Sequence, residues 1–433
     1  MRILVVGSGG REHALVWKIR QSPKVKKIYC EPGNGGTIGE TRIPSAGISQ
    51  IDELIRFAQA EQIDLTVVGP ELPLTQGIVD HFERHGLRIV GPTAAAAQLE
   101  ASKLFAKEFM QRHRIPTAHY ARASSSAQAL ALIREDNFGF PLVIKADGLA
   151  AGKGVIIAQD LDEAELTIQR IMQEKILGLA GENVILEEFL RGEEVSFLVF
   201  SDGTHTLPMV PSQDHKTVFD DDLGPNTGGM GAYSADWILT PELHQHILKT
   251  IVTPTLQGMA AEGTPYRGIL YFGLMLTEQG PKVLEFNARM GDPETQPVLF
   301  RLQTDLVDVF EAILERRLDQ VELRWDNDCS VCVVLASGGY PGNFERGKVI
   351  SGLSEADALP NVKVFHAGTE LNAGQWITSG GRVLGVTAKG QTLQSAINLA
   401  YEAVVKIHFD GMHYRRDIGR KGLKKQAGMA SAG

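Results

Sequence analysis

Three polar side chains alternate in the segment 284–295, which reads Leu-Glu-Phe-Asn-Ala-Arg-Met-Gly-Asp-Pro-Glu-Thr. Alternate residues of a strand point to the same face, so Glu285 and Asn287 would present two oxygen ligands together. Mg²⁺ prefers such oxygen donors and shares them with substrate phosphates. Arg289 would reach the same side and contact a transferring phosphoryl group or a carboxylate. The spacing predicts a divalent metal site, with a surface ladder of ion pairs as the purely structural alternative.

A lysine followed by a glycine-rich stretch occupies positions 145–154, Lys-Ala-Asp-Gly-Leu-Ala-Ala-Gly-Lys-Gly. The stretch lacks the four-residue gap and the final Ser or Thr of a P-loop. We expect Lys145, at the end of an apolar strand, to neutralise phosphates while a glycine flap closes over them. A hairpin with solvated lysines is the alternative. The expected flap residues are Gly148, Gly152, Lys153 and Gly154.

Gly-Ser-Gly-Gly-Arg-Glu-His at 7–13 follows an apolar strand and opens a helix, where free backbone N–H groups favour an anion. Its spacing mimics a dinucleotide fingerprint. However, Glu12 stands where the third glycine belongs, and Glu31 is followed by Pro-Gly-Asn-Gly-Gly instead of ending its strand as a ribose partner. A phosphate of another ligand is favoured over NAD, and a tight turn without ligand is the structural alternative.

An acidic stretch follows a strand that is predicted to begin at Val184. It covers 187–194 and reads Glu-Glu-Phe-Leu-Arg-Gly-Glu-Glu. Backbone groups at such a hinge can contact an adenine edge, and a nearby carboxylate can accept both ribose hydroxyls. Alone, an acidic run is usually a solvated turn.

The bulk composition limits the classes of partner. With 433 residues, 43% of them hydrophobic, the chain should form several domains. A net charge of -9 without a long basic run argues against nucleic acid, so we expect small-molecule substrates. The three cysteines suit buried thiols. No long apolar run or secretory leader is apparent, which predicts a cytoplasmic protein without membrane contact.

The predicted elements position these segments. The first hundred residues alternate strands with helices, which is typical of a parallel, doubly wound unit. A helix from Leu104 to Arg112, capped by Ser102, marks a boundary. A small module between 141 and 200 could move as a lid, and the loop over 209–233 should face a substrate. Paired strands are predicted at 268–276 and 282–286, followed by a helix over 297–317. A separate α+β domain should begin at 330, and the tail after 419 should fray.

Taken in order, these segments resemble the phosphoribosylamine-glycine ligase (glycinamide ribonucleotide synthetase) family of the ATP-grasp superfamily. The resemblance runs from Met1 to about Gly419. Besides 7–13 and 145–155, it is carried by Ser-Gln-Asp-His-Lys at 212–216, Gly-Pro-Asn-Thr-Gly-Gly-Met-Gly-Ala-Tyr at 224–233 and Gly-Asp-Pro-Glu-Thr-Gln at 291–296.

The resemblance implies a multidomain α/β and α+β fold. An N-terminal Rossmann-like (pre-ATP-grasp) substrate domain would span 1–102. An ATP-grasp domain would span 103–328, with a mobile lid at about 122–193. A C-terminal α+β domain would span 329–426, followed by a flexible tail at 427–433.

The activity implied by the resemblance is ATP-dependent ligation of glycine to 5-phosphoribosylamine through glycyl phosphate. It gives glycinamide ribonucleotide, ADP and phosphate in de novo purine biosynthesis, with Mg²⁺ or Mn²⁺ as cofactor, and it is compatible with a monomer. Alternatives are another ATP-grasp carboxylate-amine ligase or carboxylase, a nicotinamide-dependent oxidoreductase and a non-catalytic nucleotide sensor.

The resemblance also implies residue roles. Lys145 and Lys107, or Lys103 one turn earlier, would hold the ATP phosphates, and Glu285 with Asn287 would bind the metal. Tyr271-Phe-Gly273 offers no further acidic ligand, which leaves the number of metal ions open. The remaining assignments are adenine at Glu187, Glu188, Phe189 and Leu190, ribose at Glu194, the phosphoribosyl group at Gly9, Gly10, Arg11 and Glu12, and glycine near Asp214, Arg289 and Pro293, with Lys145, Arg289 and Asp214 catalytic.

Overall fold

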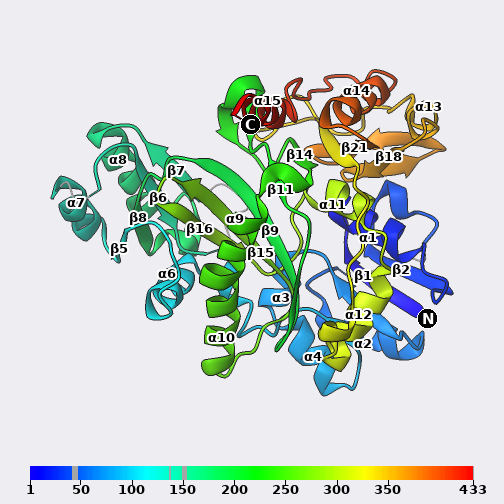
Figure 1. Ribbon diagram of the computed structural model, residues 1–433, viewed down its shortest axis with the longest axis horizontal. Helices are drawn as coiled ribbons and strands as arrows, with labels where there is room; N and C mark the ends of the chain where they lie inside the picture. Colours follow the sequence, from blue (N-terminus) through cyan, green and yellow to red (C-terminus); the bar gives the residue numbers. More distant parts are fainter. Residues whose placement is uncertain (41–46, 136–137, 149–153, 433) are drawn as a thin grey trace.

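The N-terminal unit is a parallel sheet in the order β2-β1-β3-β4 (Figure 1, blue). The structure is a computed structural model that describes residues 1–40, 47–135, 138–148 and 154–432. Parallel strands need crossover segments, and helices supply them here, so the predicted doubly wound unit is confirmed. The elements are β1 (Arg2–Gly7), α1 (Gly10–Ile19), β2 (Lys27–Pro32), α2 (Ile51–Ala60), β3 (Leu65–Val68), α3 (Glu71–Thr75), α4 (Ile78–Arg84), β4 (Ile89–Val90) and α5 (Gln98–Ala101).

The lid module is a small antiparallel sheet in the order β5-β8-β6-β7, with two helices on it and a hydrophobic core of its own. It projects on the left of Figure 1. Val195–Phe200, grouped with this module in the sequence, belongs instead to the central sheet. The elements are β5 (Tyr120–Ala123), α7 (Ser126–Arg134), β6 (Leu142–Ala146), β7 (Val155–Ala158), α8 (Leu161–Ile168) and β8 (Val184–Glu188).

A long antiparallel sheet in the order β16-β15-β9-β11-β14-β17-β21-β18 runs through the middle of the molecule. The expected C-terminal domain therefore shares this sheet, because β14 pairs with β17. The predicted strand pair 268–276 and 282–286 is confirmed. The strands are β9 (Glu193–Asp202), β11 (Ser212–Asp214), β14 (Gly231–Ser234), β15 (Arg267–Thr277), β16 (Gly280–Asn287), β17 (Cys329–Ala336), β18 (Val362–His366) and β21 (Arg382–Gly390).

The helices differ from the sequence prediction in two places. Ser102 caps α6 (Lys103–Arg112) as expected, by accepting from the Phe105 N–H. The helix expected over 297–317 is two helices, α11 (Thr295–Arg301) and α12 (Leu306–Glu315), because Asp305 caps the second. The tail expected to fray forms α15 (Arg420–Ala432) beside α14 (Leu393–Val404).

The remaining described elements complete the central region. The expected loop over 209–233 contains short strands, among them β12 (Thr217–Phe219) and β13 (Leu223–Asn226), which form a hairpin. The helices that follow β14 are α9 (Pro241–Ile247) and α10 (Thr253–Ala261). Within the described residues, no helix has both the length and the apolarity needed to cross a membrane.

Candidate active site

A cavity of about 590 Å³ lies where the N-terminal unit, α6, the lid module and the central sheet meet. The turn after β1 and the helices α3 and α5 supply one wall. The end of β16 and the segment between β11 and β14 supply another. Tyr340 and Arg382 approach from the C-terminal part of the chain. Segments hundreds of residues apart thus converge on one volume, which has room for a nucleotide and a small second substrate.

Two buried lysines at one end share a single carboxylate oxygen. The Nζ atoms of Lys107 and Lys145 each lie 3.0 Å from Oε2 of Glu187, and all three residues are buried. Burial lowers the pKa of Lys107 to about 8, although the Glu187 charge opposes that shift. Within the described part of the chain, Oε1 of Glu187 has no hydrogen-bond partner. This end combines positive charge with an unused acceptor, a fit for phosphates and an amine-bearing base.

The flap prediction is only partly described. Lys103 donates from Nζ to the Gly148 carbonyl at 2.8 Å, and burial lowers its pKa. Gly148 and Gly154 line the cavity, whereas Gly152 and Lys153 lie outside the described residues. Lys103 and Lys107 both line the cavity, so the geometry leaves both available to phosphates.

Glu285 and Asn287 face the cavity from the end of β16, as the two-residue period predicted. Burial would raise the pKa of Glu285, but the cations around it, Lys216 first, hold that pKa below its ordinary value. Lys216 Nζ lies 3.7 Å from Glu285 Oε1. An anionic carboxylate beside an amide oxygen fits a hard divalent cation. No group of three or more His, Cys, Asp or Glu side chains among the described residues could hold a metal ion by itself, so further ligands would come from substrate phosphates and water.

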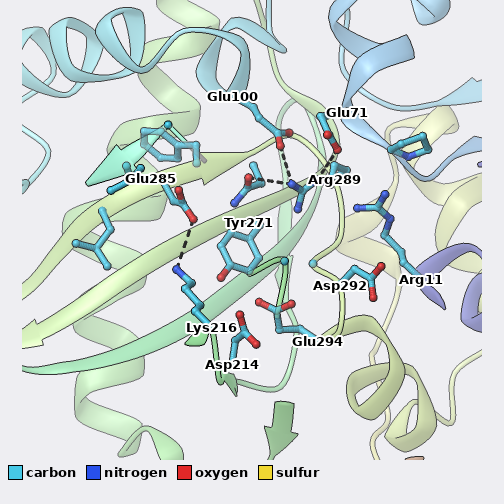
Figure 2. Close-up of a pocket in the computed structure, with 18 of the residues that line it drawn as sticks. Arg11, Glu71, Glu100, Asp214, Lys216, Tyr271, Glu285, Arg289, Asp292 and Glu294 are labelled. Carbon is cyan, nitrogen blue, oxygen red and sulfur yellow. Dashed lines mark hydrogen bonds and ion pairs between the residues drawn. The ribbon is translucent and has the colours of Figure 1, made fainter. Parts of the chain in front are cut away.

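Arg289 is fixed by carboxylates of the N-terminal unit, as Figure 2 shows. Its NH2 atom lies 2.8 Å from Glu100 Oε1 and donates to Asn287 Oδ1 at 3.1 Å. Its Nε atom donates to Glu71 Oε2 at 3.3 Å. Burial would lower the pKa of Arg289, but the Glu100 and Glu71 charges raise it, so the guanidinium stays charged.

Two further carboxylates, Asp214 and Glu294, face each other in the lower part of Figure 2. The Ser196 hydroxyl donates to Glu294 Oε1 at 3.0 Å, which leaves the Tyr271 hydroxyl to donate to Ser196 at 2.9 Å. Burial, together with the Glu294 charge, raises the pKa of Asp214 well above its ordinary value. Lys216 is hydrogen-bonded to the Glu194 carboxylate. A bound ammonium group would offset the repulsion between these two carboxylates and favour their ionised forms.

The glycine turn at 7–12 differs from the phosphate cradle that the sequence suggested. The Gly9 N–H donates to Glu12 Oε2, so a carboxylate of the chain already caps the start of α1. Arg11 donates from Nε to Glu12 Oε1 at 2.6 Å. The cations that face the cavity on this side are Arg11 and Arg382, and Arg382 NH2 donates to Asp292 Oδ2 at 3.0 Å. An anion here would contact guanidinium groups more readily than the Gly9 amide.

Most of the predicted site residues come together, and some do not. Those that line the cavity are Gly9, Arg11, Glu12, Lys103, Lys107, Lys145, Gly148, Gly154, Glu187, Asp214, Glu285, Asn287 and Arg289. Those that do not are Gly10, Glu188, Phe189, Leu190, Glu194 and Pro293. Gly10 is the first residue of α1 and packs closely against Gln296. A Cβ atom added to Gly10 would lie 2.6 Å from Gln296 Nε2. Glu188 points away from the cavity and pairs with Lys282 at 3.2 Å.

Sequence reasoning missed several cavity residues. Some lie inside segments that carry the resemblance and could have been found there, among them Lys216, Thr227, Asp292 and Glu294. Others have no local signal: Glu71, Glu100, Tyr340 and Arg382.

Comparisons with known proteins identify the family of the chain. Three domains of one family match the chain: "Phosphoribosylglycinamide synthetase, N domain" over residues 1–100, "ATP-grasp (A) domain" over 101–295 and "C domain" over 330–421. The phosphoribosylamine-glycine ligase of Pseudomonas aeruginosa is 53% identical over 431 residues, covering 99% of this chain and 100% of the relative. That of Vibrio cholerae is 52% identical over 429 residues, covering 98% and 99%.

Solved structures give the same result. The crystal structure of phosphoribosylamine-glycine ligase from Thermotoga maritima matches with a TM-score of 0.79 at 33% identity, covering 96% of this chain and 100% of that one. The biotin carboxylase domain of a Hydrogenobacter thermophilus carboxylase, in complex with MgADP, ADP and bicarbonate, matches with a TM-score of 0.72 at 15% identity, covering 95% and 91%. That second likeness shows the fold alone. By the family match and by these identities, the chain belongs to the phosphoribosylglycinamide synthetase family, with an ATP-grasp domain at its centre.

Proposed function

We propose that this protein joins glycine to 5-phosphoribosylamine at the expense of ATP, giving glycinamide ribonucleotide, ADP and phosphate in de novo purine biosynthesis. One observation carries the proposal. A single cavity gathers two buried lysines, the pair Glu285 and Asn287, and Arg289. Phosphoryl transfer to a carboxylate needs such positive charge, because it brings anionic oxygens of both reactants together.

The nucleotide occupies the end of the cavity between α6 and the lid module. Lys107 and Lys145, and Lys103 beside them, contact its phosphates, and the flap that includes Gly148 and Gly154 covers them. Within the segment 187–190, Glu187 lines the cavity, and its unpaired Oε1 accepts a hydrogen bond from the adenine amino group. Closing the flap excludes water, which would otherwise hydrolyse a reactive intermediate.

Magnesium or manganese fits beside the phosphates. Glu285 and Asn287 would hold it, with phosphate oxygens and water as the other ligands. When bound, the metal supplies positive charge that draws electron density from the transferring phosphoryl group.

Glycine binds between the two charged regions of the cavity. Its ammonium group lies against the carboxylates of Asp214 and Glu294, and its carboxylate points toward Arg289. This orientation neutralises the buried acidic pair and presents a carboxylate oxygen to the γ-phosphate. Pro293 supports the same wall from the turn that carries Asp292 and Glu294.

The chemistry proceeds in two displacements. One carboxylate oxygen of glycine attacks the γ-phosphorus, the bond to the bridging oxygen breaks, and ADP leaves with that electron pair. The amine nitrogen of phosphoribosylamine then attacks the acyl carbon, and the C–O bond to the phosphate breaks. The amine's proton passes to the departing phosphate, which carries away one oxygen of glycine. Arg289 stabilises the charge that develops on the acyl oxygen.

The phosphoribosyl group lies on the side of the turn at 7–12. Guanidinium groups of Arg11 and Arg382 face the cavity there, and guanidinium binds phosphate in a bidentate manner. The Glu12 carboxylate, which caps α1, is an acceptor for ribose hydroxyls.

The organisation that we propose keeps the boundaries expected from the sequence. A substrate domain spans 1–102, an ATP-grasp domain with a lid at about 122–193 spans 103–328, a C-terminal domain spans 329–426, and the tail is 427–433. We also place the protein in the cytoplasm as a monomer. Sedimentation velocity at micromolar concentration tests the monomer, and a single species of twice the chain mass would exclude it.

A coupled ADP-release assay tests the proposed activity. The reaction is run with MgATP, glycine and freshly prepared phosphoribosylamine, and then with each component omitted. We expect sustained ADP release only with all three. Glycine replaced by alanine or bicarbonate serves as the control for another ligase or a carboxylase. Equal ADP release without glycine would exclude the ligase, and quenching of NADH fluorescence on mixing would favour an oxidoreductase instead.

A further inference from the structure

Glu100 is a buried carboxylate that none of the motifs discussed above includes. It lies on α5, at the end of the N-terminal unit, and only 6% of its side chain is exposed. Oε2 accepts from the Ala288 N–H at 2.6 Å, and Oε1 lies 2.8 Å from Arg289 NH2. One carboxylate therefore contacts both the backbone and the side chain of the segment that follows β16, close to 190 residues later in the chain.

The environment of Glu100 is unfavourable for stability alone. Burial raises the pKa of Glu100, and the nearby Glu71 charge adds to that shift against the opposing Arg289 charge. A buried carboxylate that is incompletely compensated is weak evidence for a stabilising role. Such groups are kept where they fix the geometry of a site.

The contacts of Arg289 explain what Glu100 would fix. The NH2 atom of Arg289 contacts both Glu100 and Asn287 Oδ1, its Nε atom donates to Glu71, and its NH1 atom donates to the Met290 carbonyl at 3.3 Å. Without Glu100, the polar partner that NH2 retains among the described contacts is the Asn287 amide oxygen. The guanidinium would then keep an uncharged partner at NH2 and one carboxylate, Glu71, at Nε, so its orientation at the cavity wall would be less tightly fixed.

We propose that Glu100, assisted by Glu71, is a positioning residue that holds Arg289 in its productive orientation, so that the N-terminal unit sets the catalytic geometry of the ATP-grasp unit. This role rests on the proposed function. A shift of about 1 Å in a catalytic group can cost about a hundredfold in rate. The loss should appear in kcat and in the KM for glycine, whose carboxylate faces Arg289. The KM for ATP should change less, because the phosphates also contact the lysines of α6 and β6.

Two substitutions of Glu100 test separately the charge and the length of its side chain. Glu100→Gln keeps the side-chain length and removes the charge. Glu100→Asp keeps the charge but shortens the side chain by one methylene, so that it no longer spans Ala288 and Arg289. Glu71→Gln removes the charge of the second carboxylate partner, at a site that is one-third exposed, where the variant should fold. The matched control is Glu83→Gln, because Glu83 pairs with Arg267 and also links the N-terminal unit to the central sheet, but lies outside the cavity.

Steady-state kinetics and thermal unfolding are measured on all four variants. We expect kcat to fall about ten- to hundredfold for both Glu100 variants and severalfold for Glu71→Gln, with the KM for ATP within about twofold of wild type. Glu83→Gln should keep the wild-type kcat. A purely structural role would lower the unfolding temperature and leave the kinetics of the folded fraction unchanged.

The outcomes distinguish the two levels of the proposal. Wild-type turnover in folded Glu100 variants, or in Glu71→Gln if the Glu100 variants do not fold, would overturn the positioning role alone. A wild-type protein without glycine-dependent ADP release would overturn the proposed function, and this role with it.

Discussion

If the buried lysine pair binds the nucleotide phosphates as proposed, nucleotide affinity should depend on pH. Burial lowers the pKa of Lys107 to about 8. Phosphates favour its charged form, so a bound nucleotide should return the pKa to about 10.5 or above. Nucleotide binding above pH 8 should then take up a proton, and the affinity should fall as the pH rises.

The expected magnitude follows from these two pKa values. About three quarters of Lys107 is charged at pH 7.5 and about 3% at pH 9.5, if its free pKa is about 8. The dissociation constant should therefore rise about twentyfold between these pH values. Lys103 should steepen the change, because burial lowers its pKa as well.

The stability of the nucleotide-free protein should show the opposite sign. The folded pKa of Lys107 lies below its ordinary value, so the unfolded chain binds more protons between about pH 8 and 10.5. The contribution of Lys107 to the free energy of unfolding should therefore increase as the pH rises through this window. Opposite trends in affinity and stability would separate this titration from general alkaline unfolding.

Calorimetric titration with MgADP at pH 7.5, 8.5 and 9.5, in buffers of different ionisation enthalpy, measures both the affinity and the proton uptake. Lys107→Met should weaken binding at pH 7.5 by about tenfold or more, as loss of a charge-assisted hydrogen bond does, and should flatten the pH dependence. Lys249→Met, at an exposed helix position, is the control. Constant wild-type affinity over the range, or an unchanged slope in Lys107→Met, would refute the reasoning.

Three further substitutions test other parts of the cavity. Lys145→Ala should abolish ADP formation while circular dichroism and unfolding temperature stay near wild type. Glu285→Ala should raise the Mg²⁺ concentration needed for half-maximal rate at least tenfold and nearly abolish turnover; near-normal turnover in folded protein would refute the metal assignment. Asp214→Asn should raise the KM for glycine about tenfold or more, as loss of one charged hydrogen bond to an ammonium does, and leave the KM for ATP unchanged. An equal rise in both KM values would place Asp214 outside the glycine site.

Local sequence patterns were sufficient to predict a site residue where the direction of its side chain follows from its own helix or strand. Glu285 and Asn287 face the cavity because side-chain direction in a strand repeats every two residues, which can be predicted from the sequence. The same rule, applied to β8, would have excluded Glu188. Glu187 faces the cavity, so its neighbour must point to the other face, where it pairs with Lys282. The break between α11 and α12 could also have been predicted from the sequence, because Asp305 is a favourable N-cap residue for a new helix.

The remaining residues depend on how distant segments pack. Glu71 and Glu100 approach Arg289 only because α3 and α5 follow β3 and β4 at one edge of the N-terminal sheet. Arg382, on β21, approaches Asp292 because α11, which begins just after Asp292, packs against β21. No spacing within one segment encodes such contacts. Similarly, the start of α1 looks like an anion site until the side chain of Glu12 is seen to cap it.

The path of a single oxygen atom tests the central claim most directly. Glycine labelled with ¹⁸O in its carboxylate is converted with unlabelled MgATP and phosphoribosylamine, and the phosphate released is analysed by mass spectrometry. Transfer of the γ-phosphoryl group to the carboxylate predicts one ¹⁸O atom in each phosphate formed. Phosphate without label, released together with glycinamide ribonucleotide, would contradict an acyl-phosphate route through this cavity.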